Sequence, residues 1–214
     1  MRVTVFGATG GTGKQVVDQA LAAGHKVTAV ARNPQAAEAA LGERDGLTVV
    51  PGDVLDAESV ATATAGSDAI ISVLGVADRK QPTTVYSAGV ANMVRAMGES
   101  GPRRIIALSA DGVEPNPNVN IGQRLVMALV VARMFKHQYK DMLEMERVLA
   151  EADVDWTVVR PPRLSDGEHT GEYRVDAEEP MKDSSTISRA DLADFIVTRL
   201  ADEDTHRKIV WVSK

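Results

Sequence analysis

Cysteine is absent from the 214 residues of this sequence, and its absence excludes several kinds of site. Disulfides, cysteine-based zinc sites and a thiol nucleophile are impossible without it. We expect a cytoplasmic protein, because a reducing compartment gives disulfides no role. His25, His137 and His206 show no metal-ligand spacing, and we therefore expect no metal site.

Positive charge and long apolar runs are also scarce. The net charge is −6 and the pI is about 5.3, so Lys and Arg are poorly suited to neutralising nucleic-acid phosphates. The longest apolar run, residues 125–131, is far shorter than the roughly 20 residues that span a bilayer. No basic segment followed by an apolar one marks a secretory signal at the N-terminus. We expect neither nucleic-acid nor membrane partners. The apolar run is expected to be a buried helix face or, alternatively, a flap over a substrate pocket.

Short apolar runs alternate with helical patterns along the whole chain. Strands that are apolar throughout and are separated by helices indicate a parallel sheet covered on both faces. The predicted fold is therefore α/β, a Rossmann-like doubly wound parallel sheet forming a single domain over residues 1–214. Strands are expected at residues 3–6, 26–31, 47–50, 69–74, 104–109, 156–160 and 209–212, and helices at 12–23, 35–41, 57–64, 84–97, 138–151 and 189–200.

Two longer segments break this alternation, at about residues 112–136 and 161–185. The first begins as a loop that holds Pro115, Pro117 and three asparagines, and the second is irregular. Both follow predicted strands, so both should lie at the carboxyl ends of the sheet. Ligands bind at that edge in open α/β folds, and we expect these segments to shape a substrate site.

A glycine-rich turn occupies residues 7–13, between the first strand and the first helix, with the sequence Gly-Ala-Thr-Gly-Gly-Thr-Gly. Gly7 permits the tight turn, Gly10 lets a pyrophosphate approach the backbone, and Gly13 lets the helix pack closely on the sheet. The helix N-terminus adds N–H donors and partial positive charge. A P-loop is excluded, because Lys14 is followed by Gln15. The turn therefore predicts a dinucleotide site that also includes Thr9, Gly11 and Thr12.

The end of the second strand indicates which dinucleotide is bound. An NAD site usually places Asp or Glu there, to accept hydrogen bonds from the ribose hydroxyls. This strand instead ends Ala31-Arg32-Asn33. A guanidinium pairs with phosphate in a bidentate fork, so Arg32 favours the 2′-phosphate of NADP(H). The alternative is a solvated arginine that begins a surface loop.

Two further segments follow strands on the same edge of the predicted sheet. Asp53 and Val54 follow the third strand, where a carboxylate is suited to accept from the adenine amino group. The alternative for Asp53 is a residue that caps the next helix or stabilises a turn. The residues Leu74, Gly75 and Val76 end the fourth strand, and we expect the cofactor to pass close to this backbone.

Several stretches resemble the NmrA-like group of atypical short-chain dehydrogenases, and within it the small flavin reductases also called biliverdin-IXβ reductases. Besides the glycine-rich turn, the matching stretches are Gly52-Asp53-Val54-Leu55, Leu74-Gly75, Pro82-Thr83-Thr84-Val85, Arg160-Pro161-Pro162, Thr170-Gly171-Glu172-Tyr173, Ile187-Ser188 and Asp191-Leu192. The resemblance implies that the turn, Arg32 and Asp53 hold NADP. It places Ser109 beside the nicotinamide, as a candidate catalytic residue, and Pro161 at the cofactor. It also implies a small planar acceptor such as FMN, a quinone or a tetrapyrrole.

The sequence departs from this group at two positions near the expected acceptor. Members can carry a histidine after the Pro-Pro pair, where this chain has Arg163. They can also carry an arginine after the Leu-Gly pair, where this chain has Val76. We therefore expect Arg163 to contribute to an acceptor pocket that differs from that of these relatives.

The usual acid of short-chain dehydrogenases, a tyrosine followed four residues later by lysine, is missing. Tyr86, Tyr139 and Tyr173 are followed at that spacing by valine, leucine and alanine. We therefore predict an NADPH-dependent oxidoreductase that transfers hydride to a flavin or similar planar acceptor with little acid–base help. The alternatives are a non-enzymatic NADP(H)-binding redox sensor, and a quinone reductase or sugar epimerase on the same scaffold. A monomer or weak homodimer is expected.

Overall fold

A computed structural model describes residues 1–76, 78, 81–98, 101–118, 122 and 132–214 of the chain. These residues form an eight-stranded sheet in the order β3-β2-β1-β4-β5-β6-β10-β8. Neighbouring strands are parallel except β10 and β8, which are antiparallel. The predicted doubly wound sheet is confirmed. Its strands are β1 (Arg2–Phe6), β2 (Lys26–Ala31), β3 (Leu47–Pro51), β4 (Ala69–Ser72), β5 (Arg104–Leu108), β6 (Asp155–Arg160), β8 (Arg174–Asp176) and β10 (Lys208–Ser213).

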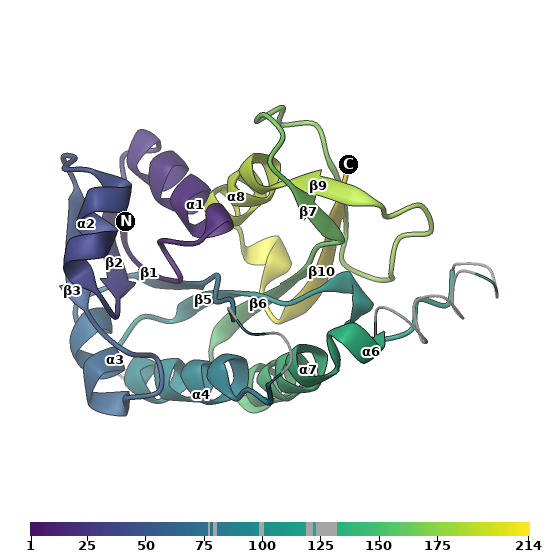
Figure 1. Cartoon of the computed structure of the whole chain (residues 1–214), viewed down its shortest axis with the longest axis horizontal. Helices are drawn as coiled ribbons and strands as arrows, with labels where there is room; N and C mark the ends of the chain where they lie inside the picture. Colours follow the sequence, from purple (N-terminus) through teal and green to yellow (C-terminus); the bar gives the residue numbers. More distant parts are fainter. Residues whose placement is uncertain (77, 79–80, 99–100, 119–121, 123–131) are drawn as a thin grey trace.

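Helices cover both faces of this sheet, as Figure 1 shows. The helices α1, α2 and α8 lie on one face, and α3, α4 and α7 lie on the other. The strands alternate between two apolar cores: Val5 and Ile71 enter the first, while their neighbours Phe6 and Ile70 enter the second. The helices are α1 (Gly11–Ala22), α2 (Pro34–Leu41), α3 (Ala57–Thr64), α4 (Val85–Met97), α6 (Ala132–Met134), α7 (Lys136–Glu151) and α8 (Arg189–Thr198), with 3-10 turns η1 (Asp111–Val113) and η3 (Glu203–Thr205).

The predicted elements agree with the structure to within two residues at nearly every boundary, but residues 161–185 are more ordered than expected. They contain β7 (Arg163–Ser165) and β8, and β7 pairs with β9 (Thr186–Ser188) in a small second sheet. Each of these strands has only three residues, too few to show a period-two pattern. The apolar segment 125–131 lies outside the described residues. No helix in the described ranges has the length and apolar character needed to cross a membrane.

Candidate functional site

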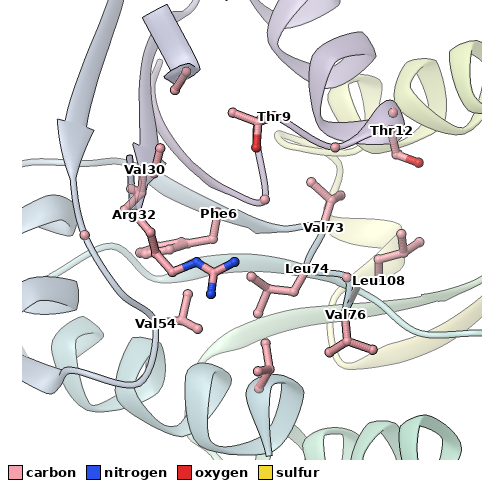
Figure 2. Close-up of a pocket in the computed structure, with 18 of the residues that line it drawn as sticks. Phe6, Thr9, Thr12, Val30, Arg32, Val54, Val73, Leu74, Val76 and Leu108 are labelled. Carbon is pink, nitrogen blue, oxygen red and sulfur yellow. The ribbon is translucent and has the colours of Figure 1, made fainter. Parts of the chain in front are cut away.

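A cavity of about 820 Å³ opens at the carboxyl ends of β1, β2, β3 and β4. It lies where the chain order of the strands reverses between β1 and β4, which is the usual ligand position in a doubly wound sheet. Its volume is in the normal range for small-molecule and cofactor sites. Figure 2 shows side chains from all of these strand ends facing the cavity. The predicted site residues that line it are Gly7, Thr9, Gly10, Gly11, Thr12, Arg32, Asp53, Val54, Leu74, Gly75 and Val76.

The glycines of the turn meet different constraints. Gly7 has φ +84°, and a Cβ atom there would lie 2.4 Å from the carbonyl oxygen of Val73. A Cβ atom on Gly13 would lie 2.0 Å from the carbonyl oxygen of Gly7. These two positions require glycine for the turn itself to close against the sheet. Gly13 therefore supports the site from beneath and does not line the cavity.

Gly10 and the start of α1 face the cavity. A Cβ atom on Gly10 would meet only the carbonyl oxygen of Gly7, at 3.3 Å, so the protein leaves this approach open. Gly10 is also the N-cap of α1, and it has no side chain to accept from the first N–H groups of the helix. The first turn of α1 carries no acidic residue. These donors and the helix dipole are therefore available to an anion, while Thr9 directs its hydroxyl toward the cavity (Figure 2).

Arg32 lines the same cavity as the glycine-rich turn. It follows β2 directly, and its guanidinium extends into the open space in Figure 2. Asn33, the next residue, caps α2 by accepting a 3.1 Å hydrogen bond from the N–H of Ala36. Within the described ranges, Arg32 forms no ion pair. Its charge is therefore positioned for a ligand anion.

The loop after β3 is held rigidly beside Arg32. The N–H of Asp53 donates to the hydroxyl of Ser59 at 3.0 Å, and a carboxylate oxygen of Asp53 accepts from the N–H of Leu55 at 3.0 Å. Asn92 of α4 donates to the carbonyl oxygen of Val54 at 2.8 Å. Asp53 and Val54 both line the cavity, and these bonds hold the loop that carries them.

The segment after β4 lines the opposite wall. Leu74 and Val76 present apolar side chains on either side of Gly75 (Figure 2). A Cβ atom on Gly75 would have no atom of the described protein within 4 Å, so this position faces open space. An apolar wall with an uncovered backbone suits a flat ring that packs against it.

Comparison with known proteins identifies the family to which this chain belongs. A family profile described as NAD(P)H-binding matches residues 7–203, which is nearly the whole chain. The chain belongs to the NAD(P)H-binding family. The match begins at Gly7, the first residue of the glycine-rich turn, and it extends past α8.

Individual relatives of this NAD(P)H-binding protein have varied descriptions. An uncharacterised chloroplastic protein of Arabidopsis thaliana is 28% identical, over 99% of this chain and 76% of its own. A reductase of Aspergillus terreus is 27% identical, over 92% of this chain and 90% of its own. A solved structure from Streptococcus pneumoniae, described as an NADH-flavin reductase, is 22% identical with a TM-score of 0.80, covering 100% of this chain and 99% of its own. At that identity the likeness concerns the fold.

The structure places Ser109 in a buried polar cluster outside the lining of the cavity. Ser109 is 4% exposed, and its hydroxyl donates to Oε1 of Glu146 at 2.5 Å. Arg160 donates to both carboxylate oxygens of Glu146, at 3.0 and 2.5 Å, and to Glu114 at 2.7 Å. Leu108, one residue before Ser109, does line the cavity. Ser109 therefore lies next to the cavity wall, but its hydroxyl is directed into the protein.

Pro161 and Arg163 also lie outside the cavity lining. The carbonyl oxygen of Pro161 accepts from the N–H of Asp111 at 2.9 Å, which joins the end of β6 to η1. Arg163 is exposed on β7, where its backbone pairs with Thr186. Leu164, the next residue in the strand, lines the cavity. Because successive side chains of a strand point to opposite faces, Arg163 is directed away from the cavity.

Sequence reasoning missed several residues that contribute to the cavity. Arg189, Leu164, Leu108 and Val85 come from strands and helices distant in the sequence. The only feature of the sequence that could have indicated these residues was their position close to the end of a strand or helix. Arg189 offered one more signal, because a cation in the first turn of a helix is unfavourable and calls for an anion nearby.

Two titratable side chains lie beyond Ser109, past the end of β5. Burial raises the pKa of the Asp111 carboxyl. Burial, together with the charge of Asp111, raises the pKa of the Tyr139 phenol. The Tyr139 hydroxyl packs so closely on Gly112 that a Cβ atom there would lie 2.7 Å from it. Tyr139 therefore stays protonated near neutral pH. No cluster of metal-binding side chains occurs among the described residues.

Proposed function

We propose that this protein is an NADPH-dependent oxidoreductase that transfers hydride to a flavin or a similar planar acceptor. The observation that carries the cofactor preference is the placement of Arg32, which extends into the cavity without an ion pair among the described residues. An NADH site would have a carboxylate at this position, and a carboxylate would repel a 2′-phosphate.

The lining residues support one orientation of the dinucleotide. The pyrophosphate is placed at the N–H groups of α1, with Thr9 and Thr12 as hydroxyl donors. Arg32 is placed at the 2′-phosphate, and Asp53 accepts from the adenine amino group. The nicotinamide then lies toward the wall formed by Leu74, Gly75, Val76 and Leu108.

The chemistry requires little acid–base catalysis from the protein. When bound, the nicotinamide cofactor supplies a hydride, and a flavin or quinone ring accepts it and takes a proton from water. The apolar wall provides a surface against which the nicotinamide and acceptor rings are held. Proximity and orientation then account for the rate enhancement. Ser109 follows Leu108, the last residue of β5, and its small side chain limits bulk beside the nicotinamide. Leu164, in the segment 161–185, lines the cavity and borders the acceptor, whereas its neighbour Arg163 points away.

The direct test is the consumption of NADPH, followed at 340 nm, with FMN as the acceptor. The matched control is Arg32→Ala, which retains the fold and the glycine-rich turn. We expect the unmodified protein to oxidise NADPH when FMN is present. The variant should need a higher NADPH concentration to reach half its maximal rate. Tight NADPH binding without turnover of FMN or quinones would contradict the proposal.

A different class of function would leave a distinct result. A redox sensor of the NmrA-like type would bind the oxidised and reduced cofactor with different affinities and would consume neither. A sugar epimerase would show no net loss of NADPH. The apolar wall and the absence of a tyrosine–lysine pair favour the reductase among these. A cytoplasmic setting and a monomer or weak homodimer remain part of the proposal.

A further inference from the structure

Arg189 lies across the start of the helix that follows the glycine-rich turn. It is the first residue of α8, and it lines the same cavity as the turn. A Cβ atom on Gly11 would lie 2.8 Å from both Cδ and Nε of Arg189. Gln19 of α1 donates to the carbonyl oxygen of Ala190 at 2.8 Å, so the two helices are tied together at this point. The guanidinium is therefore held over the N-terminus of α1.

This position is electrostatically unfavourable without a further anion. The first turn of α1 has partial positive charge and no acidic residue, and Arg189 adds a full charge beside it; α8 has Asp191 in its own first turn. The ion-pair partner of Arg189 is Asp166, 2.5 Å from NH1. The Asp166 side chain is 90% exposed, whereas that of Arg189 is 30% exposed. An ion pair so accessible to water stabilises the protein little.

We propose that Arg189 binds the pyrophosphate of the nicotinamide dinucleotide. The inference deepens the proposed function at the same site, and it rests on cofactor binding alone, not on the acceptor. A guanidinium presents several N–H groups in one plane, so it is able to hold Asp166 through NH1 and a phosphate through its other nitrogens. The bond from Gln19 to Ala190 already holds Arg189 at the turn, so Asp166 is not needed to position it.

The assignment separates the roles of the two arginines in the cavity. Arg32 follows β2 and is placed at the 2′-phosphate, which only NADPH carries. Arg189 lies over Gly11, where α1 offers its N–H groups to the pyrophosphate that NADPH and NADH share. Loss of Arg189 should therefore weaken both cofactors by the same factor, and loss of Arg32 should weaken NADPH selectively.

The experiment measures dissociation constants for NADPH and for NADH by calorimetry, without any acceptor. The variants are Arg189→Ala, Asp166→Ala and Arg32→Ala, each checked for an unchanged thermal transition. Arg189→Ala should weaken both cofactors about tenfold or more, the effect of losing a charge-assisted hydrogen bond. Asp166→Ala keeps the guanidinium and should change either affinity less than about threefold, within the range of an exposed ion pair.

Three results would overturn the inference. Equal losses in Arg189→Ala and Asp166→Ala would make Arg189 a tether for the loop that holds Asp166. A loss confined to NADPH would assign Arg189 to the 2′-phosphate. Unchanged affinities in Arg189→Ala would remove it from the cofactor site. Because no acceptor is present, a failure to reduce FMN would contradict the proposed reductase without affecting this test.

Discussion

The hydroxyl of Ser109 donates to Oε1 of Glu146 at 2.5 Å, across the interface between the end of β5 and α7. Arg160 of β6 holds the same carboxylate with two hydrogen bonds. Ser109, which is expected from the sequence to lie beside the nicotinamide, thus also belongs to a buried cluster of charged side chains. Its role in turnover and its role in stability are therefore separable by experiment.

Replacing Glu146 with Gln removes the main counter-charge of a buried arginine while keeping the shape of the side chain. Breaking a buried ion pair in this way costs about 3 kcal/mol. Ser109→Ala removes one hydrogen bond and should cost about 1 kcal/mol in the free energy of unfolding. Urea denaturation of both variants gives these values. A Ser109→Ala variant that is as stable as the parent but much slower in turnover would contradict this account.

Arg32→Asp should reverse the preference between the two cofactors. The substitution removes a charge-assisted pair of roughly 1.5–3 kcal/mol and places a carboxylate where the 2′-phosphate binds. We expect NADPH to weaken far more than NADH, as measured by the ratio of their dissociation constants. Equal affinities for the two cofactors in the unmodified protein would contradict the assignment of Arg32.

Two glycines of the turn should respond differently to substitution. Gly10→Val places a branched side chain in the open cavity, so we expect loss of NADPH binding with an unchanged thermal transition. Gly13→Ala forces a Cβ atom to within 2.0 Å of the carbonyl oxygen of Gly7. This overlap should destabilise the fold by about 1–3 kcal/mol. Unchanged NADPH affinity in Gly10→Val would show that the cofactor binds elsewhere.

Tyr139→Phe is the strictest test of hydride transfer without a protein acid, because Tyr139 lies beside Asp111 and Gly112. We expect turnover of FMN to change less than about tenfold, below the loss of 10²–10⁴ typical of a general acid. The matched control is Tyr173→Phe. Burial and the hydrogen bond to Asp194 raise the pKa of Tyr173 to about 12, and this phenol packs on Phe195. A thousandfold loss confined to Tyr139→Phe would favour carbonyl reduction.

Asp191 should contribute stability that depends on pH. Its carboxylate accepts from the N–H groups of Thr170 and Gly171 at 2.6 and 2.9 Å. Burial acts to raise its pKa, but these hydrogen bonds outweigh burial and lower it from the usual 3.8. The stability that Asp191 contributes is therefore fully present at pH values above the pKa of this carboxyl in the unfolded chain. It is lost as the pH falls through the lower pKa of the folded protein. Asp191→Asn should lower the free energy of unfolding at pH 7, and the difference from the parent should shrink below about pH 4. A constant difference would contradict this reading.

The sequence by itself determined the parts of the protein that depend on local order along the chain. Apolar strands alternating with helices specify the parallel sheet. The turn at residues 7–13 and Arg32 each follow a strand directly, so their place at the carboxyl edge follows from chain direction alone. All of these line or support the cavity, because a strand end carries the next residues to that edge whatever packs around them.

Only the tertiary structure decided where side chains at that edge point. Ser109 ends a predicted strand, but its hydroxyl points into the protein because it donates a hydrogen bond to Glu146 of α7. Arg163 and Leu164 are neighbours, and the pairing of β7 with β9 decides which of them lines the cavity. Arg189 reaches Gly11 because α8 packs beside α1, a contact between opposite ends of the chain. Such side-chain orientations depend on packing partners that are distant in the sequence, so local sequence patterns do not predict them.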